Sequence, residues 1–497
     1  MLDIKKVYKL QTDYSISEGR VKQADVDFGT YVDECRVFIA NNLPEEFNTG
    51  GWDSQKKTDY TDGLVTRYVD KHPIFVEGYI KPEGTLDSEL LLEDLRDAIS
   101  GAGILKDALE DPDVDEIQIN DKNTIFVQKH GTTIPYVDAK GRIMQFTSNS
   151  EIDVVINRLI DDGGDTQLPQ FNAGNPILNA KTSRDQYRIN AVHHSANTQD
   201  KPPYNFPITN VVIRKFKEVN LTVDDLVGSE AITDKMGRLI KYLGQAELKM
   251  FCVGPTGSGK TTLLRIIAES ALKNTNLFRR MILVQNPAEI TFKERDTYGR
   301  NIHNVVHWEV IDKASLAQLI SNTLRQTPEI ILIGEMRENE EFFQALRMMR
   351  TGHKTLGTYH AEGPEDAMAR FATELSSVGG MSYVEALRLA SEAVDVVITQ
   401  FKFPDGKRRV MGISEIQGIT EDGSVRFNDL FKFVLTGETI ENEYGLTSVS
   451  GYFSQTGTLS DYTKNKMYMS GISQKNLDEF CKIDNSDIPE HPENRTA

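Results

Sequence analysis

The sequence reads Gly254-Pro255-Thr256-Gly257-Ser258-Gly259-Lys260-Thr261 at the point that decides its fold, and this stretch matches the pattern G-x-x-x-x-G-K-[ST]. The apolar residues 249–253 before it predict a short strand, and residues 261–272 after it predict an amphipathic helix. Glycines let the backbone curl so that its N–H groups face a phosphate, and the start of a helix attracts the same anion. The stretch therefore predicts a nucleotide-binding loop rather than an ordinary glycine turn.

The residue types of this loop have separate tasks. Lys260 would place a positive charge beside the β- and γ-phosphates, and the Thr261 hydroxyl would ligate Mg²⁺. The expected cofactors are therefore ATP and Mg. We expect the nucleotide to be bound by Gly254, Pro255, Thr256, Gly257, Ser258, Gly259, Lys260, Thr261 and Thr262.

Strand and helix patterns alternate after this loop. Residues 281–284 and 329–333 are continuous apolar runs typical of buried strands, and residues 315–324 have helical spacing. The alternation predicts an α/β P-loop NTPase domain with a mostly parallel sheet. Glu335 follows the second apolar run, at the carboxyl end where such sheets bind ligands, so its carboxylate could orient or deprotonate a water molecule.

Composition excludes several classes of protein. The 497 residues carry a net charge of −18, which argues against a chain whose main task is to coat nucleic acid. The three cysteines are far apart and form neither a disulfide framework nor a zinc spacing. The sequence contains no signal-peptide pattern and no apolar run of about 20 residues. We therefore expect a cytoplasmic, multidomain protein.

Further motifs resemble the secretion and type IV pilus ATPases. Residues 324–337, ending in Ile333-Gly334-Glu335-Met336-Arg337, look like the Walker B segment of that family. His353 and His360 lie where the family has its histidine box. Residues 111–117, 187–192, 213–216 and 405–409 are similar to the branch that serves type IV secretion, conjugation and tight-adherence pili. The resemblance covers about residues 100–435.

The resemblance implies a RecA-like ATPase domain preceded by an α+β N-terminal domain, with six subunits in a ring. It also implies inner-membrane partners in a secretion, conjugation or pilus machine, with peripheral association at the inner face of the cell membrane. Arginines of the N-terminal domain or of a neighbouring subunit would reach the phosphates. The residues implied for catalysis or phosphate contact are Glu335, Glu289, His360, His353, Arg337, Arg188 and Arg214.

One departure from the family pattern concerns the residues after the strand 281–284. The family usually has two acidic residues where this chain has Gln285 and Asn286. Amides cannot act as bases and they bind Mg²⁺ less strongly than carboxylates, whereas Glu289 retains the next family carboxylate. We therefore hypothesise either slow hydrolysis or activity that requires assembly of the subunits.

These observations predict five regions and leave three functions open. The leading hypothesis is a motor of a secretion, conjugation or pilus machine, and the alternatives are a nucleic-acid translocase or helicase and a non-hydrolysing assembly subunit. The acidic balance and the lack of a basic-aromatic stripe count against direct nucleic-acid binding. The predicted regions are an acidic extension or small domain (1–90), the α+β domain (91–220), a linker (221–247), the ATPase domain (248–440) and a polar, partly flexible C-terminal extension (441–497).

Overall fold

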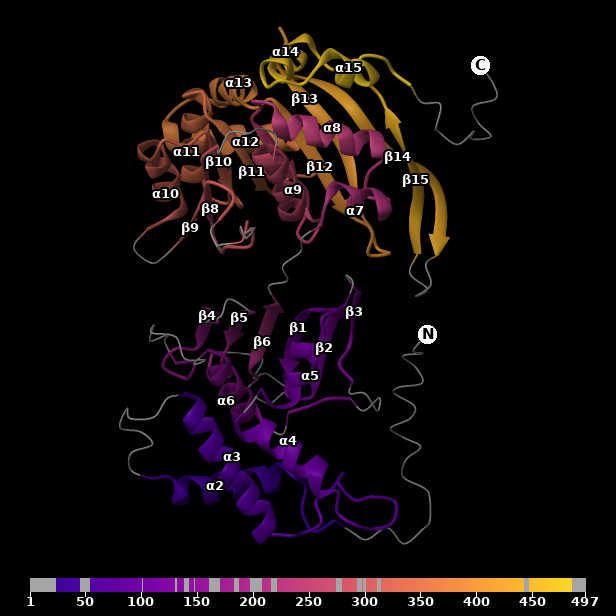
Figure 1. Ribbon diagram of the computed structural model, residues 1–497. Coiled ribbons are helices and arrows are strands. Elements are labelled where there is room, and N and C mark those ends of the chain that lie inside the picture. The colour runs from indigo at the N-terminus through magenta and orange to yellow at the C-terminus, as the bar shows by residue number, and fades with distance from the viewer. Residues whose placement is uncertain are drawn as a thin grey trace. The chain divides into compact units, whose positions relative to one another are not determined.

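The computed structural model divides the chain into two compact units, Met1–Lys217 and Glu218–Ala497, which are described separately here (Figure 1). The residues that the structure describes are 24–44, 54–100, 102–129, 132–137, 143–146, 148–160, 170–182, 187–196, 208–215, 221–273, 279–292, 297, 301–310, 314–441 and 447–484.

Among the described residues of unit 1, the first three helices have a core of their own. They are α2 (Phe28–Asn42), α3 (Ser54–Lys71) and α4 (Ser88–Ser100). The Asp27 side chain accepts a hydrogen bond from the Thr30 N–H and so caps the start of α2. Helix α4 contributes Leu91 and Leu95 to the same core as α2 and α3. The helical part therefore continues past residue 90, where we predicted a domain boundary.

The rest of unit 1 is built on six antiparallel strands in the order β3-β2-β1-β6-β5-β4. Helix α6 (Asn149–Ile160) contributes Ile152, Val155 and Ile156 to the core on one face of this sheet. The remaining elements are η2 (Gly103–Leu105), α5 (Lys106–Glu110), β1 (Val114–Asp121), β2 (Thr124–Lys129), β3 (Thr132–Pro135), β4 (Ile177–Lys181), β5 (Tyr187–Val192) and β6 (Asn210–Lys215).

Unit 2 contains a nine-stranded sheet in the order β15-β14-β13-β12-β7-β11-β10-β8-β9. The strands from β12 to β9 pair in parallel, and β13, β14 and β15 extend the sheet in antiparallel fashion. The predicted mostly parallel sheet is confirmed. The strands are β7 (Met250–Val253), β8 (Met281–Gln285), β9 (Val305–Glu309), β10 (Ile330–Ile333), β11 (Lys354–Tyr359), β12 (Val396–Lys402), β13 (Arg408–Ile419), β14 (Val425–Glu441) and β15 (Thr447–Gln455).

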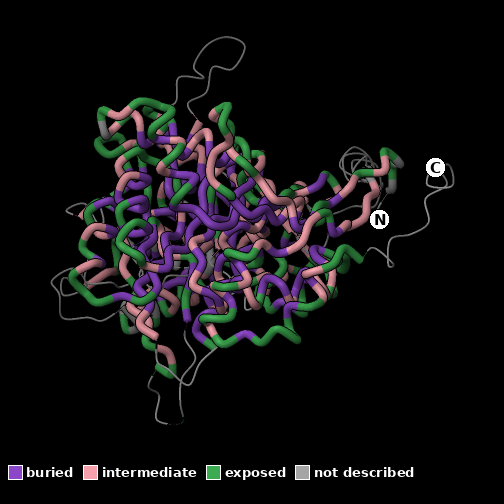
Figure 2. The backbone as a smooth tube through the Cα atoms, turned by 90° about the horizontal axis from the view of Figure 1, so that it is seen from above, coloured by how far each residue is buried: buried purple, intermediate pink, exposed green. Residues whose placement is uncertain are grey.

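Helices cover both faces of this sheet, and two separate apolar cores result. Every residue of β7, β10 and β11 is buried, as expected for strands covered on both sides. Figure 2 shows such buried residues inside the molecule and exposed ones around them. One core includes α7 (Val223–Gly228), α8 (Asp234–Gln245) and α9 (Lys260–Lys273), and the other includes α10 (Leu316–Thr323), α11 (Asn339–Arg350), α12 (Pro364–Gly379) and α13 (Tyr383–Ala393), with η3 (Leu324–Gln326) after α10.

Residues 221–247, predicted as a linker, instead form part of the ATPase core. Thr222 and Asp225 form a capping box at the start of α7. In α8, Leu239 and Leu243 are completely buried. The prediction was wrong because a short amphipathic helix has few apolar residues, and only the sheet it packs against shows that they are core residues.

Part of the predicted C-terminal extension also belongs to unit 2. Strand β15 pairs with β14, and Met467 and Phe480 lie in the same apolar core as α8. The Arg238 guanidinium of α8 donates two hydrogen bonds to the Glu479 carboxylate, at 2.8 and 2.7 Å. The elements after β15 are α14 (Asp461–Met469), α15 (Gln474–Leu477) and η4 (Asp478–Phe480). Residues 485–497 lie outside the described part of the chain.

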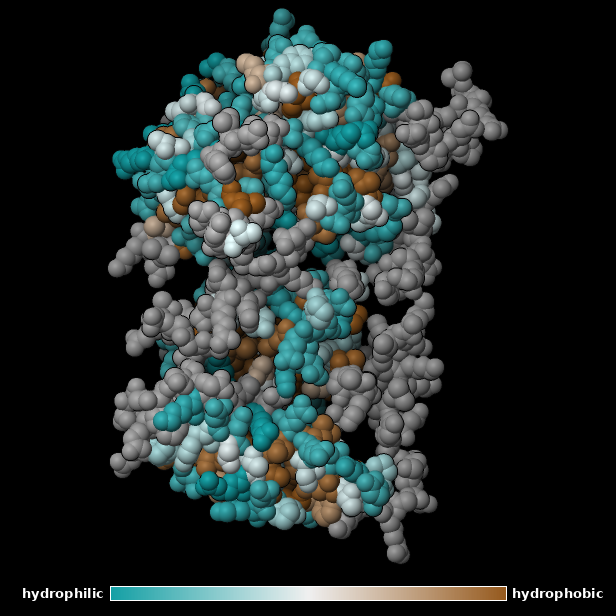
Figure 3. Space-filling model, in the orientation of Figure 1, coloured by the Kyte–Doolittle hydropathy of each residue, from teal (hydrophilic) through white to brown (hydrophobic). Residues whose placement is uncertain are grey.

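Among the residues that are coloured in Figure 3, hydrophilic side chains surround smaller groups of apolar ones. Of the described helices, none is long and apolar enough to cross a bilayer. The large apolar side chains that are exposed include Met469 (76% exposed) and Ile483 (56% exposed), both in the C-terminal segment of unit 2.

Candidate functional site: the carboxyl edge of the parallel sheet

The glycine-rich loop joins β7 to α9, as the sequence predicts. Gly254, Gly257 and Gly259 have φ angles of 151°, 74° and 94°, in the region that favours glycine. A Cβ atom on Gly254 would lie 2.0 Å from the backbone carbonyl oxygen of Gln400 in β12. The loop therefore follows a path against β12 that only glycine permits.

Lys260 is the first residue of α9 and its side chain is buried. Its Nζ donates hydrogen bonds to the carbonyl oxygens of Gly254 and Pro255, at 3.0 and 2.9 Å. Burial lowers the pKa of Lys260, while the negative charge of Glu335 opposes that shift. The ammonium is thus held within the loop, close to an acidic partner.

His360 connects Lys260 to Glu335. It directly follows β11, and its Nε2 lies 2.8 Å from the Glu335 Oε1. Its Nδ1 lies 3.3 Å from the Lys260 Nζ. The Nδ1 also lies 3.2 Å from the Gly254 carbonyl oxygen. In the tautomer protonated at Nε2, the neutral imidazole can donate to Glu335 and accept from Lys260 at the same time. A change in the hydrogen bonding of Lys260 can therefore be transmitted to the carboxylate through one ring.

Glu335 is held from its other side by Arg337. The Arg337 Nε donates to the Glu335 Oε2 at 2.8 Å, and the guanidinium Nη2 binds the same oxygen. The Arg337 backbone N–H donates to Glu341 at the start of α11, which fixes the chain after β10. Because two groups orient the two oxygens, the carboxylate has a defined direction beside the phosphate loop.

Gln285 has a structural task. It is the amide at a position where the family has an acid. It is 1% exposed at the end of β8. Its Oε1 accepts from the N–H groups of Glu289 and Ile290, at 2.9 and 2.7 Å, and its Nε2 donates to the Ile290 carbonyl oxygen at 3.0 Å. A carboxylate could accept the first two bonds but could not donate the third. Gln285 therefore supports the turn that carries Glu289. The negative charge of Glu289 acts to raise the pKa of Lys260.

His353 is not brought to this site within the chain. It precedes β11, whereas His360 follows it, so the two histidines lie at opposite edges of the parallel sheet. The six residues of the strand span about 20 Å. The His353 Nδ1 lies 2.9 Å from the Thr351 hydroxyl in the turn after α11. In its own subunit, His353 is thus a turn residue.

Arg188 and Arg214 belong to unit 1. They lie directly opposite each other on β5 and β6, so their side chains share one face of that sheet. Glu116 of β1 is opposite Arg214 in the same row. That the two arginines reach the nucleotide phosphates stays a prediction.

The structure adds Gln400 and Arg408 to the site. The Gln400 side chain approaches Gly259, and the Arg408 Nε donates to the Gly257 carbonyl oxygen at 2.9 Å. Sequence reasoning singled out residues 405–409 as a family motif but assigned them no place in the site. Their contact with a loop about 150 residues earlier depends on β12 lying next to β7.

The loop fits a chain of phosphates. The Ser258 Oγ is buried and has no hydrogen-bond partner among the described residues, so it is available to an additional acceptor or donor. The nearby oxygen donors, the Thr261 hydroxyl and the carboxylates of Glu335 and Glu289, are of the kind that Mg²⁺ prefers. When bound, Mg²⁺ would neutralise negative charge that develops on the phosphates.

The parallel sheet, the phosphate loop and the carboxylate at the next strand end define an α/β P-loop nucleotide-binding protein. The family model described as Type II/IV secretion system protein matches residues 109–404, more than half of the 497 residues. The chain belongs to this family. The predicted membership among the secretion and pilus ATPases is confirmed.

The chain is also similar to individual proteins. The conjugal transfer protein TrbB of Rhizobium radiobacter is 24% identical over 313 residues, which are 63% of this chain and 86% of TrbB. The type IV pilus ATPase PilU of Pseudomonas aeruginosa is 30% identical over 170 residues, or 34% of this chain and 40% of PilU. The solved structure of the Legionella pneumophila ATPase DotB matches with a TM-score of 0.43 and 21% identity, over 64% of this chain and 80% of that one.

Proposed function

We propose that this protein is an ATP-hydrolysing motor that powers macromolecule transfer or pilus assembly in a machine of the type IV secretion or conjugation kind. The observation that carries the proposal is the continuous contact from Lys260 through His360 to Glu335 at the carboxyl edge of the sheet. Family membership and the relatives TrbB and PilU support the secretion, conjugation or pilus setting.

Each residue of this contact has a chemical task. Lys260 and the loop N–H groups bind the phosphates, and Thr261 with the neighbouring carboxylates would hold Mg²⁺. Glu335 accepts a proton from, or orients, the attacking water. When Lys260 turns from the loop carbonyls to phosphate, the His360 Nδ1 loses its donor, and the ring can report this change to Glu335. Nucleotide occupancy is thereby coupled to the catalytic carboxylate.

We further propose how the subunits assemble. The active form is a homohexamer in which Arg188 and Arg214 contribute charge at the phosphates of their own or a neighbouring site. It is bound peripherally at the inner face of the cell membrane through inner-membrane components of the machine. Mass in solution with a non-hydrolysable ATP analogue tests the ring, and a strict monomer at micromolar concentration would contradict it.

ATP turnover with Mg²⁺ tests the enzyme. We expect Lys260→Ala and Glu335→Gln to lower kcat at least about a hundredfold, because each removes a group that acts directly on the phosphates or on water. Glu362→Gln is the matched control, since Glu362 is an exposed acid two residues after His360. Wild-type turnover no higher than that of the two site variants would rule out the motor.

A further inference from the structure

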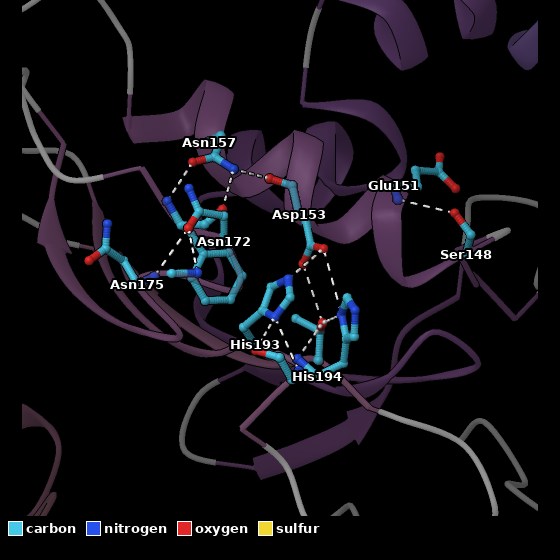
Figure 4. Close-up of polar contacts among 12 residues, drawn as sticks. Ser148, Glu151, Asp153, Asn157, Asn172, Asn175, His193 and His194 are labelled. Carbon is cyan, nitrogen blue, oxygen red and sulfur yellow. Dashed lines mark hydrogen bonds and ion pairs between the residues drawn. The ribbon is translucent and has the colours of Figure 1, made fainter.

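A second group of chemically active side chains lies in unit 1. Among the described residues, Asp153, His193 and His194 bring their ligand atoms within 4.8 Å of one another. The Asp153 Oδ2 lies 3.3 Å from the His193 Nε2 and 3.7 Å from the His194 Nδ1. Figure 4 shows both imidazole rings directed at the same carboxylate.

Local structure explains how two adjacent histidines face one carboxylate. Successive side chains of a strand point to opposite faces, so neighbours in β5 could not both reach Asp153. Strand β5 ends at Val192, and residues 193–196 form a turn closed by a hydrogen bond from the Ala196 N–H to the His193 carbonyl. The turn brings the two ring centroids to 3.9 Å.

Surrounding contacts hold the three ligands in place. The His193 Nδ1 lies 2.8 Å from the Ser195 hydroxyl and accepts a hydrogen bond from the Ser195 backbone N–H at 3.1 Å, while Nε2 faces Asp153. Asn157 of α6 exchanges hydrogen bonds with the backbone of Phe171, whose ring packs edge-on against His193 at 5.4 Å. His193 is thus held by a hydrogen bond at its other ring nitrogen and by packing against its ring.

We propose that Asp153, His193 and His194 form a binding site for a divalent transition-metal ion, with Zn²⁺ as the ion that fits best. Two imidazole nitrogens and one carboxylate oxygen are ligands that Zn²⁺ uses in proteins. Ligand atoms on a tetrahedral Zn²⁺ with bonds of about 2.0–2.1 Å lie about 3.3 Å apart. On a six-coordinate ion with bonds of similar length they would lie about 2.9 Å apart. The 3.3 Å distance between Asp153 and His193 equals the tetrahedral value, and the 3.7 Å distance between Asp153 and His194 is closer to that value than to the six-coordinate one.

The ion would complete its coordination next to Thr209. The Thr209 Oγ1 lies 3.3 Å from both the Asp153 Oδ1 and the His194 Nδ1, so this hydroxyl or a water beside it can supply the fourth ligand. His194 is 29% exposed, which gives the ion a way in, and His193 is 7% exposed. The site would join α6 to the ends of β5 and β6 and so stabilise unit 1.

Titration of the full, chelator-treated chain with Zn²⁺ in the absence of nucleotide tests this site. We expect one ion per chain from the site, and at least a tenfold loss of affinity in His194→Ala and in Asp153→Asn. Asp153→Asn keeps the size of the side chain, and His194 is partly exposed, so both variants should fold. His307→Ala, at an exposed position of β9 in unit 2, is the control and should bind Zn²⁺ like the wild type.

Two further measurements distinguish a preformed metal site from nonspecific metal binding. Zn²⁺ should raise the Tm of the wild type and of His307→Ala but leave that of Asp153→Asn unchanged, because an ion stabilises only the fold that binds it. Co²⁺ in place of Zn²⁺ should give the intense visible absorption of tetrahedral coordination in the wild type and in His307→Ala but not in Asp153→Asn. Equal affinities, or equal Tm shifts, in the wild type and Asp153→Asn would overturn the proposal.

Discussion

The two ends of strand β11 carry similar residues but do different things. At the carboxyl end, His360 lies against Lys260 and Glu335, and Lys260 also binds two loop carbonyls. At the amino end lie His353 and Lys354, and Lys354 also donates to two backbone carbonyls, those of Gly244 and Ala246. Each end therefore has a histidine and a buried lysine bonded to the main chain.

Acidic groups act on both lysines, since Glu247 opposes the effect of burial on the pKa of Lys354, so the difference lies in the open glycine backbone. The carboxyl end has Glu335 and Glu289 acting on Lys260, and the loop there has a buried hydroxyl at Ser258 that has no hydrogen-bond partner within the described part of the chain. At the amino end, Lys354 is 2% exposed and connects β11 to the segment after α8. The same residue types are thus suited to chemistry at one edge and to stability at the other, because strand polarity gathers the loops that bind ligands at carboxyl ends.

The largest effect, a loss of nucleotide affinity, should come from Gly254→Ala in the loop at the carboxyl edge of the sheet. The new Cβ would lie 2.0 Å from the Gln400 carbonyl oxygen, so the phosphate loop must move away from β12. We expect nucleotide affinity to fall more than about a hundredfold, since the loop N–H groups lose their common direction. Fluorescent-nucleotide titration measures this. Gly363→Ala is the control, because a Cβ there meets nothing closer than 3.6 Å, and unchanged affinity in Gly254→Ala would contradict the tight path of the loop.

The paired variants His360→Ala and His353→Ala compare the two edges directly. We expect His360→Ala to lower kcat roughly tenfold to a hundredfold, the effect of losing a hydrogen bond to a charged group. His353→Ala should change kcat less than about threefold if its task is confined to the turn after α11. Steady-state ATPase assays decide between them, and equal losses would show that His353 acts in a site formed with another subunit.

The free energy of unfolding should depend on pH because of Lys354, the buried lysine at the amino end of β11. Burial lowers the pKa of Lys354 to about 7, from an ordinary value of 10.5. Between these values the unfolded chain binds more protons than the folded one, so this residue makes the free energy of unfolding rise with pH. Between pH 7 and pH 9, the free energy of unfolding of the wild type should rise by about 1–3 kcal/mol more than that of Lys354→Met. Denaturant titrations of both proteins measure the difference, and a difference independent of pH would contradict the lowered pKa.

Gln285→Glu, which places an acid where the family has one, should lower stability without raising turnover. The variant loses the hydrogen bond to the Ile290 carbonyl oxygen and buries a carboxylate, so we expect stability to fall by about 1–3 kcal/mol. Turnover should not rise, because the side chain supports the turn that carries Glu289. Asn286→Asp, at an exposed neighbouring position, is the control for added charge. A clear rise in kcat for Gln285→Glu would show that the amide limits hydrolysis.

The sequence by itself determined the parts of this protein whose signals are contiguous. The phosphate loop, the apolar runs that became β7, β8 and β10, and Glu335 at a strand end are short local patterns, and each has one physical interpretation. Family membership followed from several such motifs in order. The structure confirms the elements and the mostly parallel sheet they predict.

Only the tertiary structure decided which distant residues meet. The order of strands brings His360 to Lys260 and sends His353 to the opposite edge, and it places Arg408 on the phosphate loop. Packing against the sheet also places the helices predicted as a linker in the core. In unit 1, the fold brings Asp153 close to the two histidines of the turn after β5. These contacts join residues about 40 to 150 positions apart, and no local pattern contains them, because strand order and packing are set by the burial of whole faces.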